Sequence, residues 1–196
     1  MIRDYIWRTI ATFVARPAVT DWLIRRAQRT PYSPIIKDGV LYMDRFWLFN
    51  AYPDTGGSGA DRPRWQFPIS IRIHHIVMPD QDRHLHDHPW NARTIILRGG
   101  YHEERKVINR PWRAGSVAEH ESMRGMRSGA QGPMIEDYSR LPGDTAPLAY
   151  GEFHCITEIA PGGAWTMFIT GRYRGTWGFD VDGIKVAWRT YLGIDK

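Results

Sequence analysis

The chain has 196 residues, of which 42% are hydrophobic and 13% aromatic, enough for one packed domain and too many for a chain disordered throughout. Its net charge of +5 comes from scattered basic residues, and because no Lys/Arg block appears, the sequence argues against a nucleic-acid partner. Cys155 is the single cysteine, so no internal disulfide can form, and we expect a reducing, cytoplasmic compartment.

Residues 1–30 are predicted to form an amphipathic helical extension. Apolar side chains recur there at three- and four-residue spacing, and Pro17 separates this helix from a second, shorter one. The apolar stripe consists of Ile2, Tyr5, Ile6, Thr9, Ile10 and Phe13. We expect the stripe to pack on the domain or on a partner subunit, with an interfacial membrane anchor as the alternative. The longest uncharged run in this extension, from Thr9 to Ala15, is too short to cross a membrane.

Residues 35–188 are predicted to form one domain of short strands, because apolar and aromatic segments alternate with Gly- and Pro-containing turns. The expected strands are 40–50, 69–77, 84–90, 94–101, 102–108, 145–149, 153–159, 164–170 and 174–179. Residues 110–137 show little periodicity and are predicted to be a long loop. Many short strands after a helical prelude indicate an all-β, antiparallel sandwich or barrel.

The segment "PISIRIHHIV" alternates strictly, which is typical of a half-buried strand. The alternation puts His75 on the apolar face with the isoleucines, and His74 on the other face with Arg72. His75 is expected either to be a hydrogen-bonded core residue or to point into a cavity at the site discussed next.

Histidines occupy every second position of "HLHDH", at His84, His86 and His88. On a strand, such side chains share a face about 6.6 Å apart, so two imidazoles can lean onto one metal ion. A further ligand has to come from elsewhere, and His154 is the best candidate. Glu158 is expected on the same strand face as His154, as a fourth ligand or as a carboxylate that orients a histidine.

These residues resemble the two motifs of the cupins, which are small antiparallel jelly-roll barrels. The first motif is roughly G(x)5HxH(x)3–4E(x)6G, and "HDH" at His86–His88 with Gly99 and Gly100 resembles its histidine pair and closing glycine. The second is roughly G(x)5PxG(x)2H(x)3N, which "GDTAPLAYGEFH" resembles at Gly143, Gly151 and His154. The chain also resembles cupin-like proteins of bacteria and their phages that share "LHDHPW" and "PGD". The resemblance implies a cupin-type jelly-roll barrel with the helical extension added.

The glutamate of the first cupin motif is missing, because its place falls on Ala92 or Arg93. A site of three histidines then resembles that of the thiol dioxygenases, which implies a non-haem iron oxygenase with Fe(II) as cofactor. Three imidazoles would equally suit Zn²⁺, Ni²⁺, Mn²⁺ or Cu²⁺. Without a carboxylate ligand the site carries one more positive charge, so we expect a small anionic substrate, with Arg93 as the group that positions it.

Other functions remain open at this point. The chain is alternatively a non-catalytic module that binds a metal or small ligand and serves a phage or assembly role through its helices. A third hypothesis is a metal-free, epimerase-like cupin with a histidine as general base. His84 is expected at the rim of the site, Glu158 or His75 would orient ligands or move protons, and the aromatic-rich strands would allow a homodimer.

Overall fold

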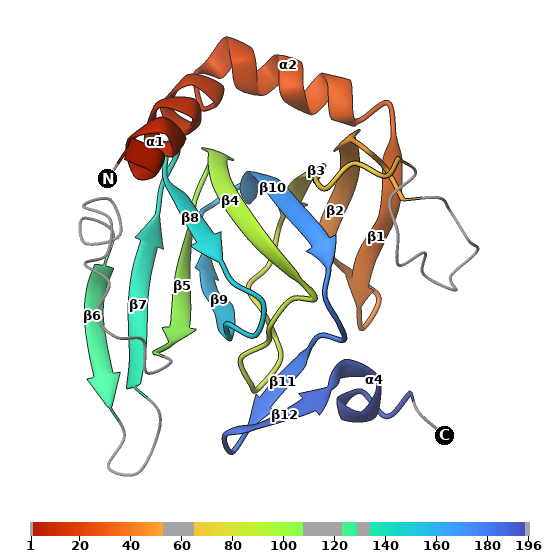
Figure 1. The fold of residues 1–196 in the computed structure, drawn as a ribbon, viewed down its shortest axis with the longest axis vertical. Helices are drawn as coiled ribbons and strands as arrows, with labels where there is room; N and C mark the ends of the chain where they lie inside the picture. Colours follow the sequence, from red (N-terminus) through yellow and green to blue (C-terminus); the bar gives the residue numbers. More distant parts are fainter. Residues whose placement is uncertain (1, 53–64, 108–122, 129–133, 195–196) are drawn as a thin grey trace.

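The computed structural model describes residues 2–52, 65–107, 123–128 and 134–194. Two helices, α1 (Ile2–Val14) and α2 (Pro17–Ala27), precede the strands, and a short helix, α4 (Trp188–Tyr191), follows them (Figure 1). The strands are β1 (Pro31–Lys37), β2 (Val40–Phe49), β3 (Ser70–Ile76), β4 (Trp90–Arg98), β5 (Tyr101–Lys106), β6 (Met123–Ser128), β7 (Met134–Arg140), β8 (Thr145–Leu148), β9 (His154–Ile159), β10 (Ala164–Tyr173), β11 (Gly178–Val181) and β12 (Ile184–Ala187).

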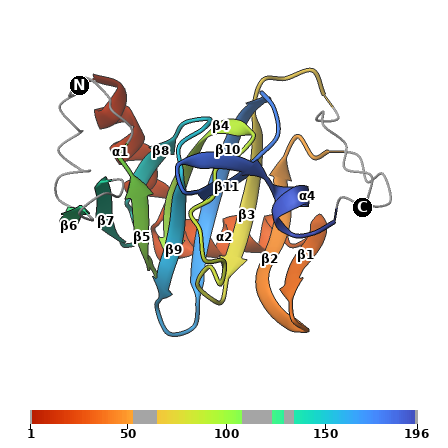
Figure 2. The same cartoon turned by 90° about the horizontal axis from the view of Figure 1, so that it is seen from below.

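The strands form antiparallel sheets, which confirms the predicted class. One sheet has the order β1-β2-β3-β10-β4-β8, a second has the order β6-β7-β5-β9, and β11 pairs with β12 in a short ribbon. Seen from below, β5 and β9 lie beside the large sheet, and α2 runs behind it (Figure 2). The described strands do not close into one continuous sheet, so the antiparallel β architecture is confirmed and the closed jelly-roll barrel is not.

Both N-terminal helices cover the outer face of the six-stranded sheet. Small and branched side chains of the helices are buried against strand residues in one core, made of Ala11, Leu23, Ile24, Ala27, Ile73, Ile95, Leu97 and Met167. Trp7 and Val14 pack at its edge, so α1 contacts the sheet through positions 7, 11 and 14, which share a helix face. The predicted helical extension is therefore present and shares a core with the strands.

The predicted apolar stripe of α1 does not pack on this domain. Ile2 and Tyr5 are 81% and 74% exposed, and Ile6, Ile10 and Phe13 are exposed as well. The expectation of packing on the domain was wrong for these residues, because the helix uses a narrower face centred on Ala11, which lets α1 approach the sheet closely. No helix in the described part of the chain is both long and apolar enough to cross a membrane.

The two faces of β3 have different surroundings, as the alternation predicted. Ile73 lies in the core under the helices, whereas Arg72 and His74 are buried on the opposite face. On that face the ring of His74 lies 5.3 Å from that of Phe168. The apolar face of β3 is thus the face that the helices cover, and the polar face points into the molecule, between the sheets.

The loop predicted over 110–137 is wrong where the structure describes it. Residues 123–128 form β6, which pairs with β7, and β7 pairs in turn with β5. Residues 110–122 and 129–133 lie outside the described residues. β6 lies at the edge of its sheet with the sequence "MRGMRS", and charged and glycine-containing edge strands lack the apolar periodicity on which sequence recognition depends.

The turn between β4 and β5 needs the glycine that closes the first motif. Gly99 has φ +73°, and a Cβ atom built there would lie 2.0 Å from the carbonyl oxygen of Gly163. No side chain fits at that distance, so the β4–β5 turn can pack against the β9–β10 turn only with glycine at this position.

Candidate metal centre

Backbone pairing brings His86 next to His154. The segment around His86 forms an isolated bridge instead of the strand predicted for 84–90, and its two partners are His154 and Phe179. The amide of each histidine donates to the carbonyl of the other, at 2.9 Å in both directions. Residues so paired on neighbouring strands lie about 5.5 Å apart at Cα, which brings a side chain of the first motif against one of the second.

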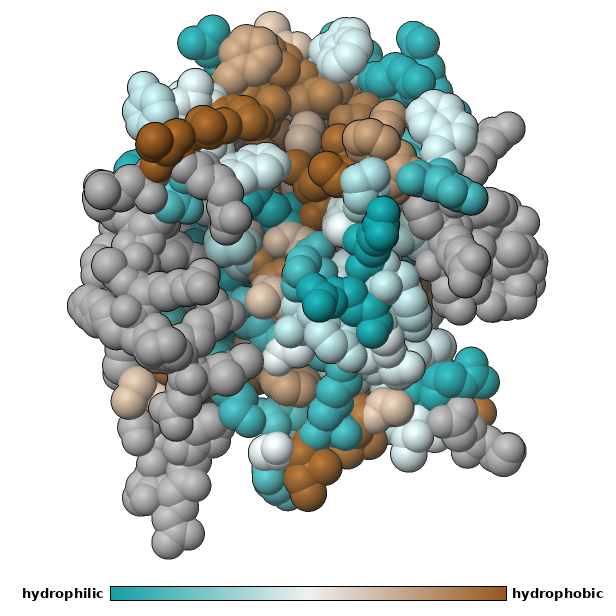
Figure 3. Space-filling model, viewed as in Figure 1, coloured by the Kyte–Doolittle hydropathy of each residue, from teal (hydrophilic) through white to brown (hydrophobic). Residues whose placement is uncertain are grey.

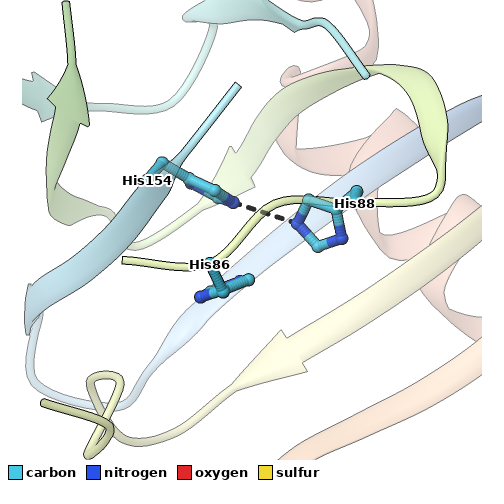
Figure 4. Close-up of side chains that lie close together, drawn as sticks. All are labelled: His86, His88 and His154. Carbon is cyan, nitrogen blue, oxygen red and sulfur yellow. Dashed lines mark hydrogen bonds between the residues drawn. The ribbon is translucent and has the colours of Figure 1, made fainter. Parts of the chain in front are cut away.

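His86, His88 and His154 point toward one another from this bridge (Figure 4). Nε2 of His88 lies 2.9 Å from Nε2 of His154, and one ring nitrogen from each of the three histidines lies within 4.8 Å of the others. With metal–nitrogen bonds of about 2.1 Å, two imidazoles on one ion are separated by roughly 3.0–3.4 Å. The first pair is close to that separation, and the His86 nitrogen lies within 4.8 Å of both.

Glu103 fixes the orientation of His154. Its Oε1 lies 2.8 Å from Nδ1 of His154, and the carboxylate is 1% exposed. Burial alone would raise the pKa of Glu103, but the neighbouring Arg105 and Arg140 outweigh burial and hold it well below its ordinary value. An ionised carboxylate can only accept, so Nδ1 of His154 donates and Nε2 keeps its lone pair toward His88.

Two arginines hold the Glu103 carboxylate in turn. Arg105 donates to its Oε1 at 3.0 Å, and Arg140 donates through Nε to its Oε2 at 2.9 Å. Arg105 also reaches Glu152 Oε1 at 3.4 Å and the carbonyl of Pro147 at 2.7 Å. The charges of this buried cluster are therefore compensated within it, and the hydrogen bonds leave Glu103 little freedom to rotate.

Asp80 has the corresponding place beside His86. Its Oδ2 lies 3.8 Å from Nδ1 of His86, an electrostatic contact too long for a hydrogen bond. The carboxylate accepts from the Tyr42 hydroxyl and, at 2.7 Å, from the amide of Ile156. Burial lowers the pKa of His86 to about 4 despite the opposing effect of Asp80, so the imidazole is neutral and able to bind a metal near neutral pH.

Asp87 holds the histidine segment from the other side. It faces away from the three histidines and is fully buried. Its carboxylate accepts from the amide of Gly178 at 2.7 Å and from Nζ of Lys185 at 2.5 Å. The β11–β12 ribbon is thereby tied to the residue between His86 and His88.

Glu158 does not reach the site. Glu103 pairs with Ile156 and the preceding His102 with Glu158, so Thr157 is an extra residue in β9. Such a bulge reverses the alternation of side chains beyond it. The Glu158 side chain is accordingly 73% exposed and lies 3.6 Å from His102, and the prediction that placed it on the face of His154 was wrong.

Arg93 and His75 also lie away from the histidines. Arg93 faces α1, with its guanidinium 4.7 Å from the Trp7 ring centroid and a hydrogen bond to Thr145. His75 stacks on Trp165 with ring centroids 4.2 Å apart, on the same outer face. Arg93 was expected at the site because the inward face of β4 was misjudged. His75 has the first of its two expected roles, since its Nε2 lies 3.2 Å from the carbonyl of Gly162, and it does not point toward the site.

His84 is half-buried and contacts α4. Its Nδ1 is 2.9 Å from the hydroxyl of Tyr191 in α4. It is not one of the three converging histidines.

Sequence reasoning missed the residues that orient the ligands. Glu103 lies in the segment "YHEERK", which forms β5. The strand alternates buried and half-buried residues, and two of its buried residues, Glu103 and Arg105, are charged. Charged residues at regularly buried positions indicate an internal ion-pair network. Asp80 lies in a loop and gives no comparable signal.

Comparisons with known proteins found only weak structural similarity. No family model matches the chain, and no curated protein sequence matches it. Among solved structures it is similar to HppE with Fe(II) and the alternative substrate (S)-1-HPP, at 12% identity and TM-score 0.44, over 74% of this chain and 57% of that one. It is also similar to oxalate decarboxylase from Bacillus subtilis at pH 4.6, at 11% identity and TM-score 0.42, over 84% of this chain and 32% of that one. Likenesses this weak say nothing about its reaction.

Proposed function

We propose that the chain is a metal-binding cupin and a non-haem iron-dependent oxygenase that acts on a small anionic molecule. The observation that carries the proposal is the convergence of His86, His88 and His154, with Nε2 of His88 and His154 2.9 Å apart. The spacing of both cupin motifs and the two facing antiparallel sheets support the same interpretation.

The three histidines would hold one divalent ion, and Fe(II) bound there would supply positions for substrate and dioxygen. The residues of the chain have definable parts in this site. Glu103 keeps His154 in the tautomer that presents Nε2. His86 and His88 stay neutral because burial lowers the pKa of each. Three neutral ligands leave the charge of the ion uncompensated, which favours an anionic substrate.

Metal analysis tests this proposal. Wild-type protein purified without an affinity tag and reconstituted with Fe(II) should hold close to one ion per chain, and His154→Ala should hold none. His75→Gln is the matched control, because that histidine stacks on Trp165 on the outer face and should leave the metal content unchanged. Zinc in preference to iron would contradict the oxygenase, and no metal in any variant after reconstitution would contradict the metal site.

A second candidate function is favoured by the exposed face of α1. Apolar side chains gather over the helices at the top of the molecule (Figure 3). Contiguous exposed apolar residues of this kind mark interaction surfaces. We therefore retain, as the alternative, a non-catalytic binding module that assembles through α1.

Self-association gives a direct test of this alternative. Light scattering after gel filtration should show a wild-type dimer, and a double variant, Ile6→Glu with Phe13→Glu, should be monomeric. Ile184→Glu is the control, because Ile184 is 69% exposed on the β11–β12 ribbon, away from α1. A monomeric wild-type protein at all concentrations measured would contradict homodimer formation.

A further inference from the structure

We infer that Arg72, His74 and Trp90 form an oxyanion-binding site beside the three histidines, which binds the anionic group of a small substrate. Its place in an active site rests on the proposed function. Its capacity to bind an anion depends on these three residues alone.

Arg72 is a buried cation without a buried anion. The residue is 6% exposed on the inner face of β3. None of the described carboxylates forms an ion pair with it, and its Nε–H has no acceptor. Nε of Arg105 likewise has no acceptor, but Arg105 and Arg140 both contact the Glu103 carboxylate, and Arg72 contacts no described carboxylate. A guanidinium that is desolvated and left without a carboxylate is costly unless a ligand compensates its charge.

Aromatic rings surround the Arg72 guanidinium. Its Cζ atom lies 4.6 Å from the ring centroids of both Trp47 and Trp90 and 5.4 Å from that of Tyr52. Ring faces stabilise a cation electrostatically but accept no hydrogen bond in the plane of the guanidinium. The rings therefore hold the group in place, the Tyr52 hydroxyl is within hydrogen-bonding reach of it, and its Nε–H is left to a planar or tetrahedral oxyanion.

Two further buried nitrogens on the inner face lack a partner. Nε2 of His74 has no hydrogen-bond partner among the described residues, and Nε1 of Trp90 has only the Tyr52 hydroxyl nearby. His74 lies two positions from Arg72 on the same face of β3, and the Trp90 ring contacts the guanidinium directly. Buried donors without acceptors are rare in folded proteins. Two such N–H groups, on Arg72 and Trp90, with a ring nitrogen of His74 beside them, indicate that a polar ligand enters from outside.

Trp90 connects this group to the candidate metal centre. Its ring is stacked with that of His88, with centroids 6.4 Å apart and planes 22° apart. Phe168 also lies between the two groups. Its ring centroid is 5.4 Å from that of His88 in the candidate metal centre and 5.3 Å from that of His74. A small molecule whose anionic group meets Arg72 would thus have its other end at the three histidines.

The ligand class follows from the donors. A guanidinium Nε–H and an indole N–H donate and cannot accept, which selects a group with several acceptor oxygens. Carboxylates, phosphates and phosphonates share this property, and a neutral amide has a single acceptor oxygen and no charge. The structure therefore assigns the site to compact oxyanions.

Calorimetric titration of metal-free protein tests the site. Acetate and phosphate are the probes, and acetamide is the neutral control. Wild-type protein should bind at least one of the two anions, and Arg72→Gln should bind it about 10- to 100-fold more weakly. Arg93→Gln, which removes an arginine from the outer face, should bind as wild type does. Equal affinity in folded Arg72→Gln and in wild type would overturn the proposal.

A second measurement needs no variant of Arg72, which matters if Arg72→Gln fails to fold. Because the Nε–H of Arg72 is buried, its proton exchanges slowly and gives a side-chain NMR signal. That signal should shift downfield on addition of the bound anion and stay in place with acetamide. Trp90→Phe, which keeps a ring but removes the N–H, should weaken binding. An Nε–H signal that neither anion moves would overturn the inference.

These outcomes separate the two proposals. Anion binding that depends on Arg72 in a protein that never holds a metal would contradict the proposed oxygenase and support the oxyanion site. Metal bound by the three histidines in a protein that binds neither anion would do the reverse.

Discussion

Nδ1 of His154 and Oε1 of Glu103 lie 2.8 Å apart, which connects the second histidine motif to a charge network buried between β5, β7 and β9. The same carboxylate contacts Arg105 and Arg140, so one residue orients a candidate ligand and forms ion pairs with two internal cations. Metal affinity and stability should therefore change together when Glu103 is altered.

Glu103→Gln tests this coupling. The amide keeps the volume but removes the charge, so His154 loses its fixed tautomer and the two arginines lose their shared anion. We expect metal affinity to fall about 10- to 100-fold, measured by competition with a chromophoric chelator. The free energy of unfolding, measured in urea, should fall by about 3 kcal/mol.

Glu158→Gln is the control, because it removes the same charge from an exposed residue of the neighbouring strand. Both quantities should stay at their wild-type values. If the two variants behave alike, the hydrogen bond between Glu103 and His154 has no part in metal binding.

Asp87→Asn should weaken the contacts that hold residues 86–88 against the β11–β12 ribbon. The asparagine can still accept from the amide of Gly178, but it loses the charge that attracts Lys185. We expect the free energy of unfolding, measured in urea, to fall by about 1–3 kcal/mol. Metal binding should also weaken, because Asp87 lies between His86 and His88 in the sequence. Lys185→Met breaks the same ion pair from its more exposed partner, so it should cost less. A larger loss in Lys185→Met would contradict this assignment.

The β4–β5 turn allows a matched test of steric packing. Gly99 and Gly39 both have positive φ, but a Cβ atom at Gly39 would meet nothing within 4 Å, whereas at Gly99 it would collide with Gly163. Gly39→Ala should cost about 1–2 kcal/mol from backbone strain alone. Gly99→Ala should cost clearly more, as measured by urea unfolding. Equal losses would show that the turns separate without penalty.

Several features of the site could be predicted from the sequence. The alternation of "HLHDH" and the spacing of the second motif identified three histidines that converge, although only an isolated bridge forms at His86. Spacing was sufficient because two backbone hydrogen bonds place His86 and His154 side by side, and because Asp87 faces the other way.

The remaining site residues could not be predicted, since each depends on contacts between distant segments. Periodicity separates the two faces of a strand but does not say which face the helices cover, so Arg93 was expected at the site although it lies on the side of α1. Glu158 was misplaced by one extra residue in β9, and a bulge leaves no trace in local sequence. The role of Glu103 can be recognised only from the structure, where its carboxylate contacts Arg105, Arg140 and His154.

The pH dependence of stability provides a test of the buried polar face of β3. Burial lowers the pKa of His74 well below its ordinary value of 6.5, and the nearby Arg72 and Arg45 lower it further. As the pH falls below about 6.5, His74 therefore binds a proton in the unfolded chain but not in the folded protein. The free energy of unfolding decreases in that range, by up to about 1.4 kcal/mol per pH unit from this residue.

His74→Gln should remove this contribution while keeping a polar side chain on the inner face. Urea unfolding of metal-free protein at about pH 7.5, 6.5 and 5.5, one unit apart around the ordinary histidine pKa, gives the slope directly. His86 and His88, whose pKa values burial also lowers, act in the same direction in both proteins, so the difference between the two slopes belongs to His74. A variant whose stability falls with pH as steeply as that of wild type would show that the folded protein protonates His74 in this range, and that its imidazole finds an acceptor or solvent when it does.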